Sequence, residues 1–319
     1  MTPGISEATQ GVYIISPTPF GDDGTIDFAS TDRLLDFFEE SGVTGLTILG
    51  ILGEAQKLTP TEARSFLAHV LKRIDGRKPV VVGASNPGTD TLVRFAQEAM
   101  DLGAAGLMIA PPPGLRTDDQ VYGYWDEVLS RIGDEIPICY QDFPQTTNTV
   151  TSVSVIARLV VAHRNLVMLK HEESPGLAKI THLRDRSDRG ELRRISILVG
   201  NGGIHLPQEL RRGADGAMTG FAYPEMLVRV CALFFAGDAE GAEDLYDLYL
   251  PILRHEQQLG FGLALRKEIL RRRGIIACAA TRHPGPKLSP RDHQELSELM
   301  TRLERKLAER SHYQPTGAR

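Results

Sequence analysis

A lysine at the end of an apolar run is the residue of this sequence best suited to covalent chemistry. The run 166–169 is apolar and leads directly into Lys170. A strand buried on both faces looks like this when its C-terminal end opens onto a site. An ammonium in such a position must reach water or lose its charge. If it is desolvated, its pKa falls and it becomes a nucleophilic amine that can attack a carbonyl carbon.

A second apolar run, Ile136–Tyr140, ends in the polar segment Gln141–Pro144 one unit earlier in the chain. We expect the rest of the chain to hold Tyr140 and Lys170 together. Two plainer interpretations stay open. A lysine after a strand is most often a solvated strand end, and Tyr140 could be a packed strand residue whose hydroxyl is satisfied.

The elements that must hold these two residues are strands and helices in strict alternation. Eight short apolar runs alternate with helical patterns, and no hairpin signal joins consecutive strands, which favours a parallel sheet. The runs are Val12–Ser16, Gly45–Leu49, Pro79–Gly83, Gly106–Ile109, Ile136–Tyr140, Leu166–Lys170, Ile195–Val199 and Gly216–Thr219. An α/β fold of the (β/α)8 TIM-barrel type accounts for them, since no Gly-x-Gly-x-x-Gly follows the first strand as an open nucleotide-binding sheet would need.

After Thr219 the pattern becomes purely helical. We therefore expect a barrel in residues 1–223 and a C-terminal helical extension in residues 224–319 packed on it. The predicted helices are Pro224–Phe235, Ala239–Leu259, Gly262–Arg273 and Pro290–Ala308. The tail Ser311–Arg319 is predicted to be disordered.

Composition narrows the classes of function. The 319 residues are 41% hydrophobic and 24% charged, with a formal net charge of -5. This mild acidity gives no reason to expect nucleic acid or an anionic membrane as a partner. Cys139, Cys231 and Cys278 show no metal-ligand spacing and fit reduced thiols. Met1–Gln10 lacks a secretory apolar core, and no run could span a bilayer, so we predict a cytoplasmic protein.

The order of several short motifs resembles one known family. These are Ser16-Pro17-Thr18-Pro19-Phe20, Gly50-x-x-Gly53-Glu54, Tyr140, Lys170 and Gly200-Asn201-Gly202. Nearly the whole chain resembles the dihydrodipicolinate synthase / N-acetylneuraminate lyase superfamily of Schiff-base lyases. Within it, Lys170–Gly176, Gly216–Gly220 and Gly274–Cys278 are most similar to 2-keto-3-deoxy sugar acid dehydratases of the L-2-keto-3-deoxyarabonate branch.

The chain also departs from the synthases of that superfamily. Ile51-Leu52 replaces a Thr-Thr pair, and Pro112-Pro113 stands where a tyrosine pair is usual. Tyr140 lies four residues before Pro144 instead of three, and a one-residue slip along a strand turns a side chain to the other face. These differences argue against a role in lysine biosynthesis.

The resemblance implies that Lys170 forms an iminium with the C2 ketone of a 2-keto acid, with Tyr140 as its proton relay. The Gly50–Gly53 backbone would bind the carboxylate as an anion nest, and the glycines at 200–203 would allow close approach of the substrate. The predicted substrate-binding set is Gly50, Ile51, Leu52, Gly53, Glu54, Glu173, Ser174, Gly200, Asn201 and Gly202. The reaction most favoured is dehydration without metal or cofactor, in a homo-oligomer (dimer or tetramer).

Four alternatives remain open at this stage. An aldolase that releases pyruvate, such as a 2-keto-3-deoxygluconate aldolase or N-acetylneuraminate lyase, would use the same lysine. A dihydrodipicolinate synthase-like condensation is the second alternative. The third is a metal-dependent barrel enzyme, suggested by the adjacent His171, Glu172 and Glu173, although neighbouring loop residues seldom converge on one ion. The last is a barrel that binds keto acids without turning them over.

Overall fold

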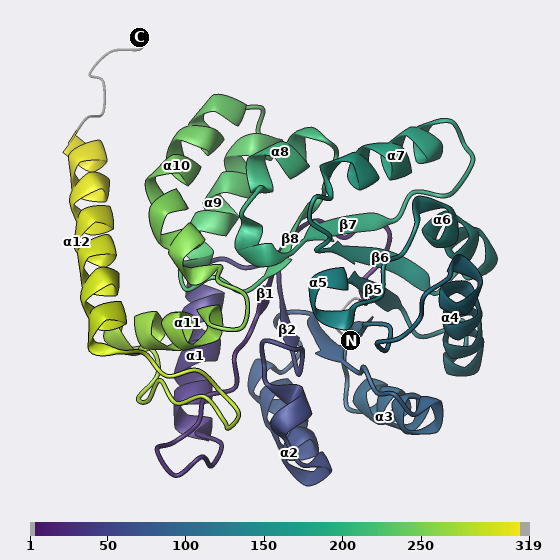
Figure 1. Cartoon of the computed structure of the whole chain (residues 1–319), viewed down its shortest axis with the longest axis horizontal. Helices are drawn as coiled ribbons and strands as arrows, with labels where there is room; N and C mark the ends of the chain where they lie inside the picture. The colour runs from purple at the N-terminus through teal and green to yellow at the C-terminus, as the bar shows by residue number, and fades with distance from the viewer. Residues whose placement is uncertain (1–3, 313–319) are drawn as a thin grey trace.

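Eight parallel strands close into one barrel, which confirms the predicted (β/α)8 fold. The computed structural model describes residues 4–312, and the strands follow one another around the barrel in chain order (Figure 1). They are β1 (Gly11–Ile15), β2 (Gly45–Ile48), β3 (Val80–Gly83), β4 (Gly106–Ile109), β5 (Ile138–Asp142), β6 (Leu166–His171), β7 (Ser196–Val199) and β8 (Gly216–Thr219). β8 pairs with β1 to close the ring.

Helices connect each strand to the next. They are α1 (Phe28–Glu40), α2 (Pro60–Ile74), α3 (Thr89–Asp101), α4 (Asp118–Ile132), the short α5 (Pro144–Thr147), α6 (Val153–Ala162), α7 (Leu177–Asp188), α8 (Leu206–Arg211) and α9 (Pro224–Phe235). Local sequence explains where they begin. Thr59 and Glu62 form a capping box at the start of α2, and Pro60 occupies its first turn, where its missing N–H has no role.

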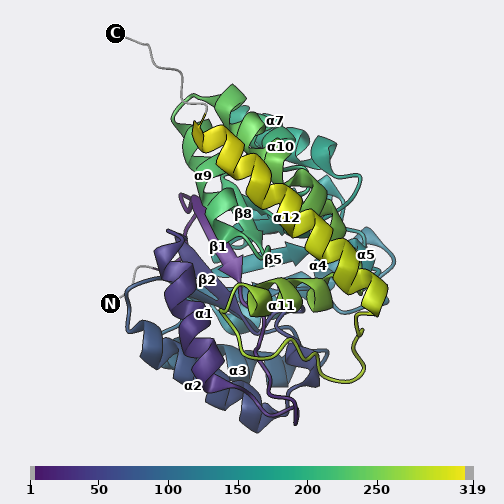
Figure 2. The ribbon, with the colours of Figure 1, turned by 90° about the vertical axis from the view of Figure 1, so that its left-hand side faces the viewer.

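Three further helices follow α9: α10 (Ala239–Glu256), α11 (Gly262–Arg272) and α12 (Pro290–His312). Figure 2 shows α12 running across one flank of the barrel, over α10 and α11. Because α9 packs against β1, it acts as the eighth helix of the ring. The division at residue 223 stays a prediction, and these contacts favour a boundary after α9. The tail predicted to be disordered lies outside the described residues from position 313 onward.

Two predicted elements end at different residues in the structure, and both differences affect the site. β5 continues through Asp142, so Gln141 belongs to the strand. The helix predicted to reach Leu259 ends at Glu256, and residues 257–261 form a connection to α11. Gly260 has a φ of 77°, which glycine adopts without strain and which a continuing helix would not allow.

The strands separate two apolar layers because their side chains alternate between faces. Inside the barrel, Tyr13, Ile15, Met108, Met168 and Met218 are among the residues of a small buried cluster. Outside it, a larger cluster packs the strands against the ring of helices. Along β6, Met168 belongs to the inner cluster and Leu169 to the outer one, so the next residue, Lys170, faces inward.

Among the helices of residues 4–312, none has the length and apolar character needed to cross a membrane. A cytoplasmic location stays a prediction.

Closure of the barrel depends on a glycine at the β1–β8 pair. Gly216 has a φ of 143°, and a Cβ there would lie 1.9 Å from the carbonyl oxygen of Gly11. We expect Gly216→Ala to reduce the free energy of unfolding by about 3 kcal/mol or more, through strain and overpacking. Urea denaturation followed by circular dichroism measures this.

The matched control is Gly237→Ala, where φ is 88° and no atom lies within 4 Å of the new methyl group. Backbone strain alone should then reduce stability by about 1–2 kcal/mol. Equal losses for the two variants would contradict the idea that close packing at the closing pair demands glycine.

Candidate active site

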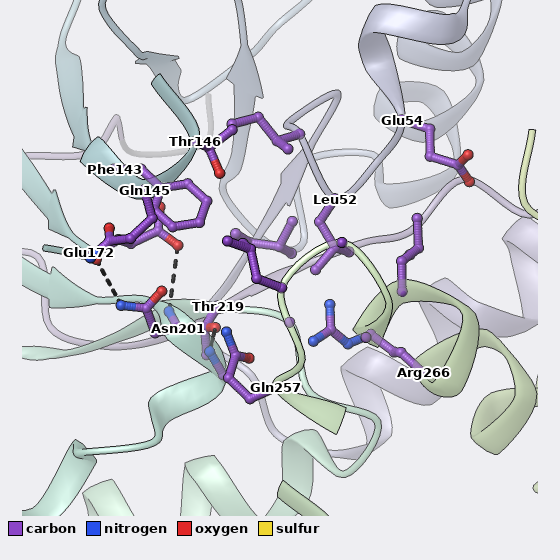
Figure 3. Close-up of a pocket in the computed structure, with 18 of the residues that line it drawn as sticks. Leu52, Glu54, Phe143, Gln145, Thr146, Glu172, Asn201, Thr219, Gln257 and Arg266 are labelled. Atoms are coloured by element: carbon purple, nitrogen blue, oxygen red, sulfur yellow. Dashed lines mark hydrogen bonds between the residues drawn. The ribbon is translucent and has the colours of Figure 1, made fainter. Parts of the chain in front are cut away.

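The C-terminal end of the barrel holds a cavity of about 700 Å³. Its floor is apolar, with Ile15 and Met108 from the barrel interior. Lys170, Gln141 and other polar residues line it at the strand ends. Figure 3 shows Glu172, Asn201 and Thr219 among its polar residues. In barrels of this type the strand ends and the loops after them carry the active site, so this cavity is the candidate.

Lys170 lies in this cavity and is only 2% exposed. Its Nζ is 2.8 Å from Oε2 of Glu172, two residues further along the chain. The two side chains meet because residues i and i+2 of an extended segment point to the same face. A carboxylate at this distance from the amine can accept its proton, which is what a nucleophilic lysine requires.

Glu172 is the functional residue that sequence analysis missed. Besides Lys170, its Oε2 accepts a hydrogen bond of 2.8 Å from Nε2 of Gln141. The Asn201 amide holds the backbone of the same residue, since its Nδ2 donates to the Glu172 carbonyl oxygen at 2.8 Å. The available signal was its spacing of two from Lys170. The sequence suggested Glu172 only as a metal ligand, together with His171 and Glu173.

Tyr140 lies on the opposite face of β5. Its ring stacks 4.1 Å from that of Trp125 on α4, and its hydroxyl hydrogen-bonds with Thr151 at 2.5 Å. Tyr140 is 1% exposed and belongs to the outer cluster, and its burial raises the pKa of the phenol. This position does not support Tyr140 as the proton relay, because the barrel wall separates it from the cavity.

Gln141 occupies the place that Tyr140 was expected to fill. It lines the cavity and donates a hydrogen bond to Glu172. Cys139, two residues earlier on the same face of β5, lies in the inner cluster. Gln141 also stands three residues before Pro144, the spacing that the family motif has for its tyrosine. Because side chains alternate along a strand, Gln141 faces the cavity at the position where the family motif has its tyrosine, and Tyr140 faces the other way.

The loop after β2 contributes to the cavity as expected for part of its length. Ile51, Leu52 and Glu54 line the cavity, whereas Gly50 and Gly53, which were also predicted to bind substrate, do not. No described residue accepts a hydrogen bond from the N–H groups of Ile51, Leu52 and Gly53. These donors are available to an anion, as a nest requires.

Glu54 is occupied by other charges. Its Oε1 accepts from Nζ of Lys267 at 2.7 Å, and its Oε2 accepts from Lys57 at 2.8 Å. Lys267 belongs to α11 and is 0% exposed, and its desolvation lowers the pKa of its ammonium. Glu54 therefore anchors α11 to the rim of the barrel instead of offering a free carboxylate to a substrate.

The turn after β7 serves the site through Glu172. Asn201 and Gly202 line the cavity, and Gly202 donates its N–H to the Thr219 hydroxyl at 2.7 Å. Gly200 has a different reason to be glycine than the one predicted. A Cβ there would lie 2.2 Å from Cγ of Glu172, so the missing side chain makes room for that carboxylate.

Glu173 and Ser174 do not line the cavity. Glu173 forms an ion pair of 2.7 Å with Lys179 of α7, which also pairs with Asp142 at 2.7 Å. The carbonyl oxygen of Ser174 accepts a hydrogen bond from Gln145. Glu173 faces away from the cavity because the alternation that brings Glu172 inward turns its neighbour outward. Ser174 lies in the connection between β6 and α7. Their predicted contacts with substrate hydroxyls are not supported.

The C-terminal extension supplies the far wall of the cavity, which the sequence did not indicate. Gln257, Gln258 and Arg266 are part of this wall. Arg266 is 5% exposed, and its Nε donates to Oε1 of Glu256 at 2.5 Å. Burial raises the pKa of Glu256, and the Arg266 charge opposes that shift.

Within the described residues, no three His, Cys, Asp or Glu side chains are placed to hold a metal ion. That the reaction needs neither metal nor cofactor stays a prediction.

Comparison with known proteins names the family. The model of the dihydrodipicolinate synthetase family matches residues 8–303 of this chain. The chain belongs to this family. It is thus a Schiff-base lyase of the dihydrodipicolinate synthetase family, built on a TIM barrel.

Two curated relatives differ in their activities. The chain is 31% identical over 308 residues to the L-2-keto-3-deoxyarabonate dehydratase of Azospirillum brasilense, covering 95% of this chain and 97% of that protein. It is 28% identical over 248 residues to a 4-hydroxy-tetrahydrodipicolinate synthase of Methanococcus maripaludis, covering 77% and 82%.

Among solved structures, the chain is similar to a dihydrodipicolinate synthase from Rhodopseudomonas palustris. The identity is 46%, the TM-score is 0.92, and the match covers 94% of this chain and 100% of the other. A dihydrodipicolinate synthase from Thermotoga maritima shares the fold, at 24% identity and a TM-score of 0.85, over 93% of this chain and 99% of the other.

A buried carboxyl behind the site generates a pH prediction. Glu209 on α8 is 8% exposed, its Oε2 has no partner among the described residues, and burial raises its pKa to about 8. The folded state therefore binds a proton that the unfolded state releases above pH 4.5. Stability from this group is complete below that pH and is lost as the pH rises toward 8.

We expect Glu209→Gln to remove this loss, so that the variant is more stable than the wild type at pH 8 by more than about 1 kcal/mol. Thermal or urea unfolding at pH 5, 6.5 and 8 measures it. Glu243→Gln, at an exposed ion pair with Arg211, is the control and should leave the pH dependence unchanged. Parallel curves for wild type and Glu209→Gln would refute the assignment.

Proposed function

We propose that this protein dehydrates a 2-keto-3-deoxy sugar acid through an iminium on Lys170. The observation that carries the proposal is the buried pair of Lys170 and Glu172 in the cavity at the C-terminal end of the barrel. An amine of this kind attacks the C2 ketone, and loss of water from the adduct gives the iminium. The match with the Azospirillum brasilense dehydratase, which spans nearly the whole of both chains, supports this substrate class.

Glu172 is our candidate for the proton transfers. Its Oε2 lies within reach of the lysine nitrogen, and so of the C3 proton next to the iminium carbon. Removal of that proton gives an enamine, because the positive nitrogen accepts the electron pair. The enamine then expels the C4 hydroxyl, which takes a proton from the Glu172 acid and leaves as water. Hydrolysis of the remaining iminium frees Lys170 and the product.

The other groups would orient the substrate. The N–H groups of residues 51–53 would bind the carboxylate at C1, as predicted from the sequence. Gln141 and Asn201 would hold Glu172 against Lys170, since both bond to it in the structure. In this scheme Gln141 positions the base, and no tyrosine takes part.

Synthase chemistry is the second candidate, favoured by the 46% identical protein from Rhodopseudomonas palustris that bears that name. Ile51 and Leu52 argue against it, because neither supplies the hydroxyl that the family's threonine pair offers. Incubation with pyruvate and aspartate semialdehyde distinguishes the two, since only the synthase would consume both compounds. An aldolase would release pyruvate from a 2-keto-3-deoxy acid.

Oligomerisation as a dimer or tetramer stays a prediction.

Borohydride should reduce the iminium on Lys170 to a stable adduct. After incubation with pyruvate and borohydride, mass spectrometry of digested wild-type protein should find the adduct on the peptide that contains Lys170. Lys170→Ala should show none, and Lys72→Ala, at an exposed position of α2, should label like the wild type. An adduct on another lysine, or none with any 2-keto acid tested, would contradict the proposed mechanism.

Substitutions of Glu172 and Tyr140 should have different effects on kcat. We expect Glu172→Gln to lower kcat for water loss by about 10²–10⁴-fold, because the amide keeps the shape but cannot take the proton. Tyr140→Phe should lose about 1 kcal/mol of stability and change kcat by less than about threefold, since its hydroxyl bonds to Thr151 on the outer face of β5. The assay follows the 2-keto-3-deoxy acid and its dehydrated product by chromatography. A larger loss for Tyr140→Phe than for Glu172→Gln would reverse the assignment.

A further inference from the structure

The guanidinium of Arg266 is a buried charge with unused donors. Only its Nε is engaged, by Glu256, and neither Nη atom donates to a described residue. Arg266 is only 5% exposed, and it lines the cavity. Figure 3 shows it directed inward beside Leu52. Two terminal nitrogens of one guanidinium form the fork that binds a carboxylate through two parallel hydrogen bonds.

Arg266 lies away from the reacting lysine. In Figure 3 it stands across the cavity from Glu172 and Asn201, with Thr219 between. Its Nη1 is 2.9 Å from where a Cβ of Gly220 would be, just after β8, whereas Lys170 is on β6. Glu172 marks the position of the reacting lysine, since its Oε2 lies 2.8 Å from Nζ of Lys170. A carboxylate directly attached to a ketone bound at Lys170 is not the natural partner of Arg266.

The charges around the cavity leave Arg266 available. Glu172 is paired with Lys170, and Glu54 with Lys267 and Lys57. Glu256 holds the Nε edge of Arg266 and also accepts the N–H of Ala222, which fixes the guanidinium with its terminal nitrogens free. Leu52 and Leu263 are part of the surrounding wall, and apolar neighbours strengthen the attraction between Arg266 and an anion placed here.

We propose that Arg266 is a specificity-determining residue that binds a second carboxylate, at the end of the substrate distant from the ketone. This inference rests on the proposed Lys170 chemistry and narrows its substrate class to keto-deoxy diacids. The C-terminal extension then belongs to the substrate site, since α10 and α11 carry Glu256 and Arg266.

The test uses two keto acids of equal length, 2-ketoadipate and 2-ketohexanoate, which differ only in a terminal carboxylate. Each is incubated with the protein over a range of concentrations, reduced with borohydride, and quantified as adduct on Lys170. The wild type should reach half-maximal labelling with the diacid at a concentration at least about tenfold lower, as expected for a charged hydrogen-bonded pair. The readout requires no turnover.

The informative variant is Arg266→Gln with Glu256→Gln, because Arg266→Gln alone would leave a buried carboxylate unpaired. In this double variant the half-maximal concentrations for the monoacid and the diacid should become nearly equal. A general loss of affinity or of lysine reactivity would affect both acids alike, so it cancels in their ratio. Arg254→Gln, at an exposed position of α10, is the control and should keep the wild-type ratio. Circular dichroism and unfolding curves establish that the double variant folds.

Two results would overturn the inference while leaving the proposed function intact. One is a pyruvate adduct on Lys170 together with a wild-type ratio near one or in favour of the monoacid, or with no adduct from either longer acid. The other is a wild-type preference for the diacid that persists in the folded double variant. Absence of any pyruvate adduct would instead refute the Lys170 chemistry, and the two failures are thereby distinguished.

Discussion

The pairing of Lys170 with Glu172 is the interaction around which the site is organised. It exists because both residues project from the same face of the segment that begins with β6, and because the cavity excludes most water from them. Gln141 approaches the carboxylate from β5, and Gly200 leaves the space that it occupies. The ends of the neighbouring strands β5 and β6 and the turn after β7 thus hold one acid–base pair at the C-terminal end of the barrel.

A second set of buried charges connects this centre to the C-terminal extension. Glu54 at the rim of the barrel binds Lys267, and Glu256 binds Arg266, and these two cations are adjacent residues of α11. A buried ion pair is weak evidence for stability, because desolvation offsets much of its attraction. Its geometry is nevertheless well defined. These two pairs hold α11 against the cavity and set the direction of Arg266, which gives the extension a part in substrate recognition.

Family membership and local chemistry answer different questions here. Membership fixes the barrel and the Schiff-base lyase class, while relatives with synthase and dehydratase names share that scaffold. The choice among reactions depends on the side chains around one lysine. In this chain Ile51 and Leu52 replace hydroxyls, Gln141 stands at the position of a tyrosine, and Glu172 is the nearest carboxylate. Our proposal of dehydration instead of condensation rests on this combination.

The sequence by itself determined the barrel, the order of its elements and the position of Lys170, because apolar runs, caps and turns are local signals. It could also have excluded Tyr140, since its spacing from Pro144 placed it on the other face of β5. Contacts between segments far apart in the chain were decided only by the tertiary structure. No local pattern shows that Arg266 reaches the cavity, that Lys267 neutralises Glu54, or that Glu173 turns away toward Lys179. Such pairings depend on how the helices pack, and packing is a property of the whole chain.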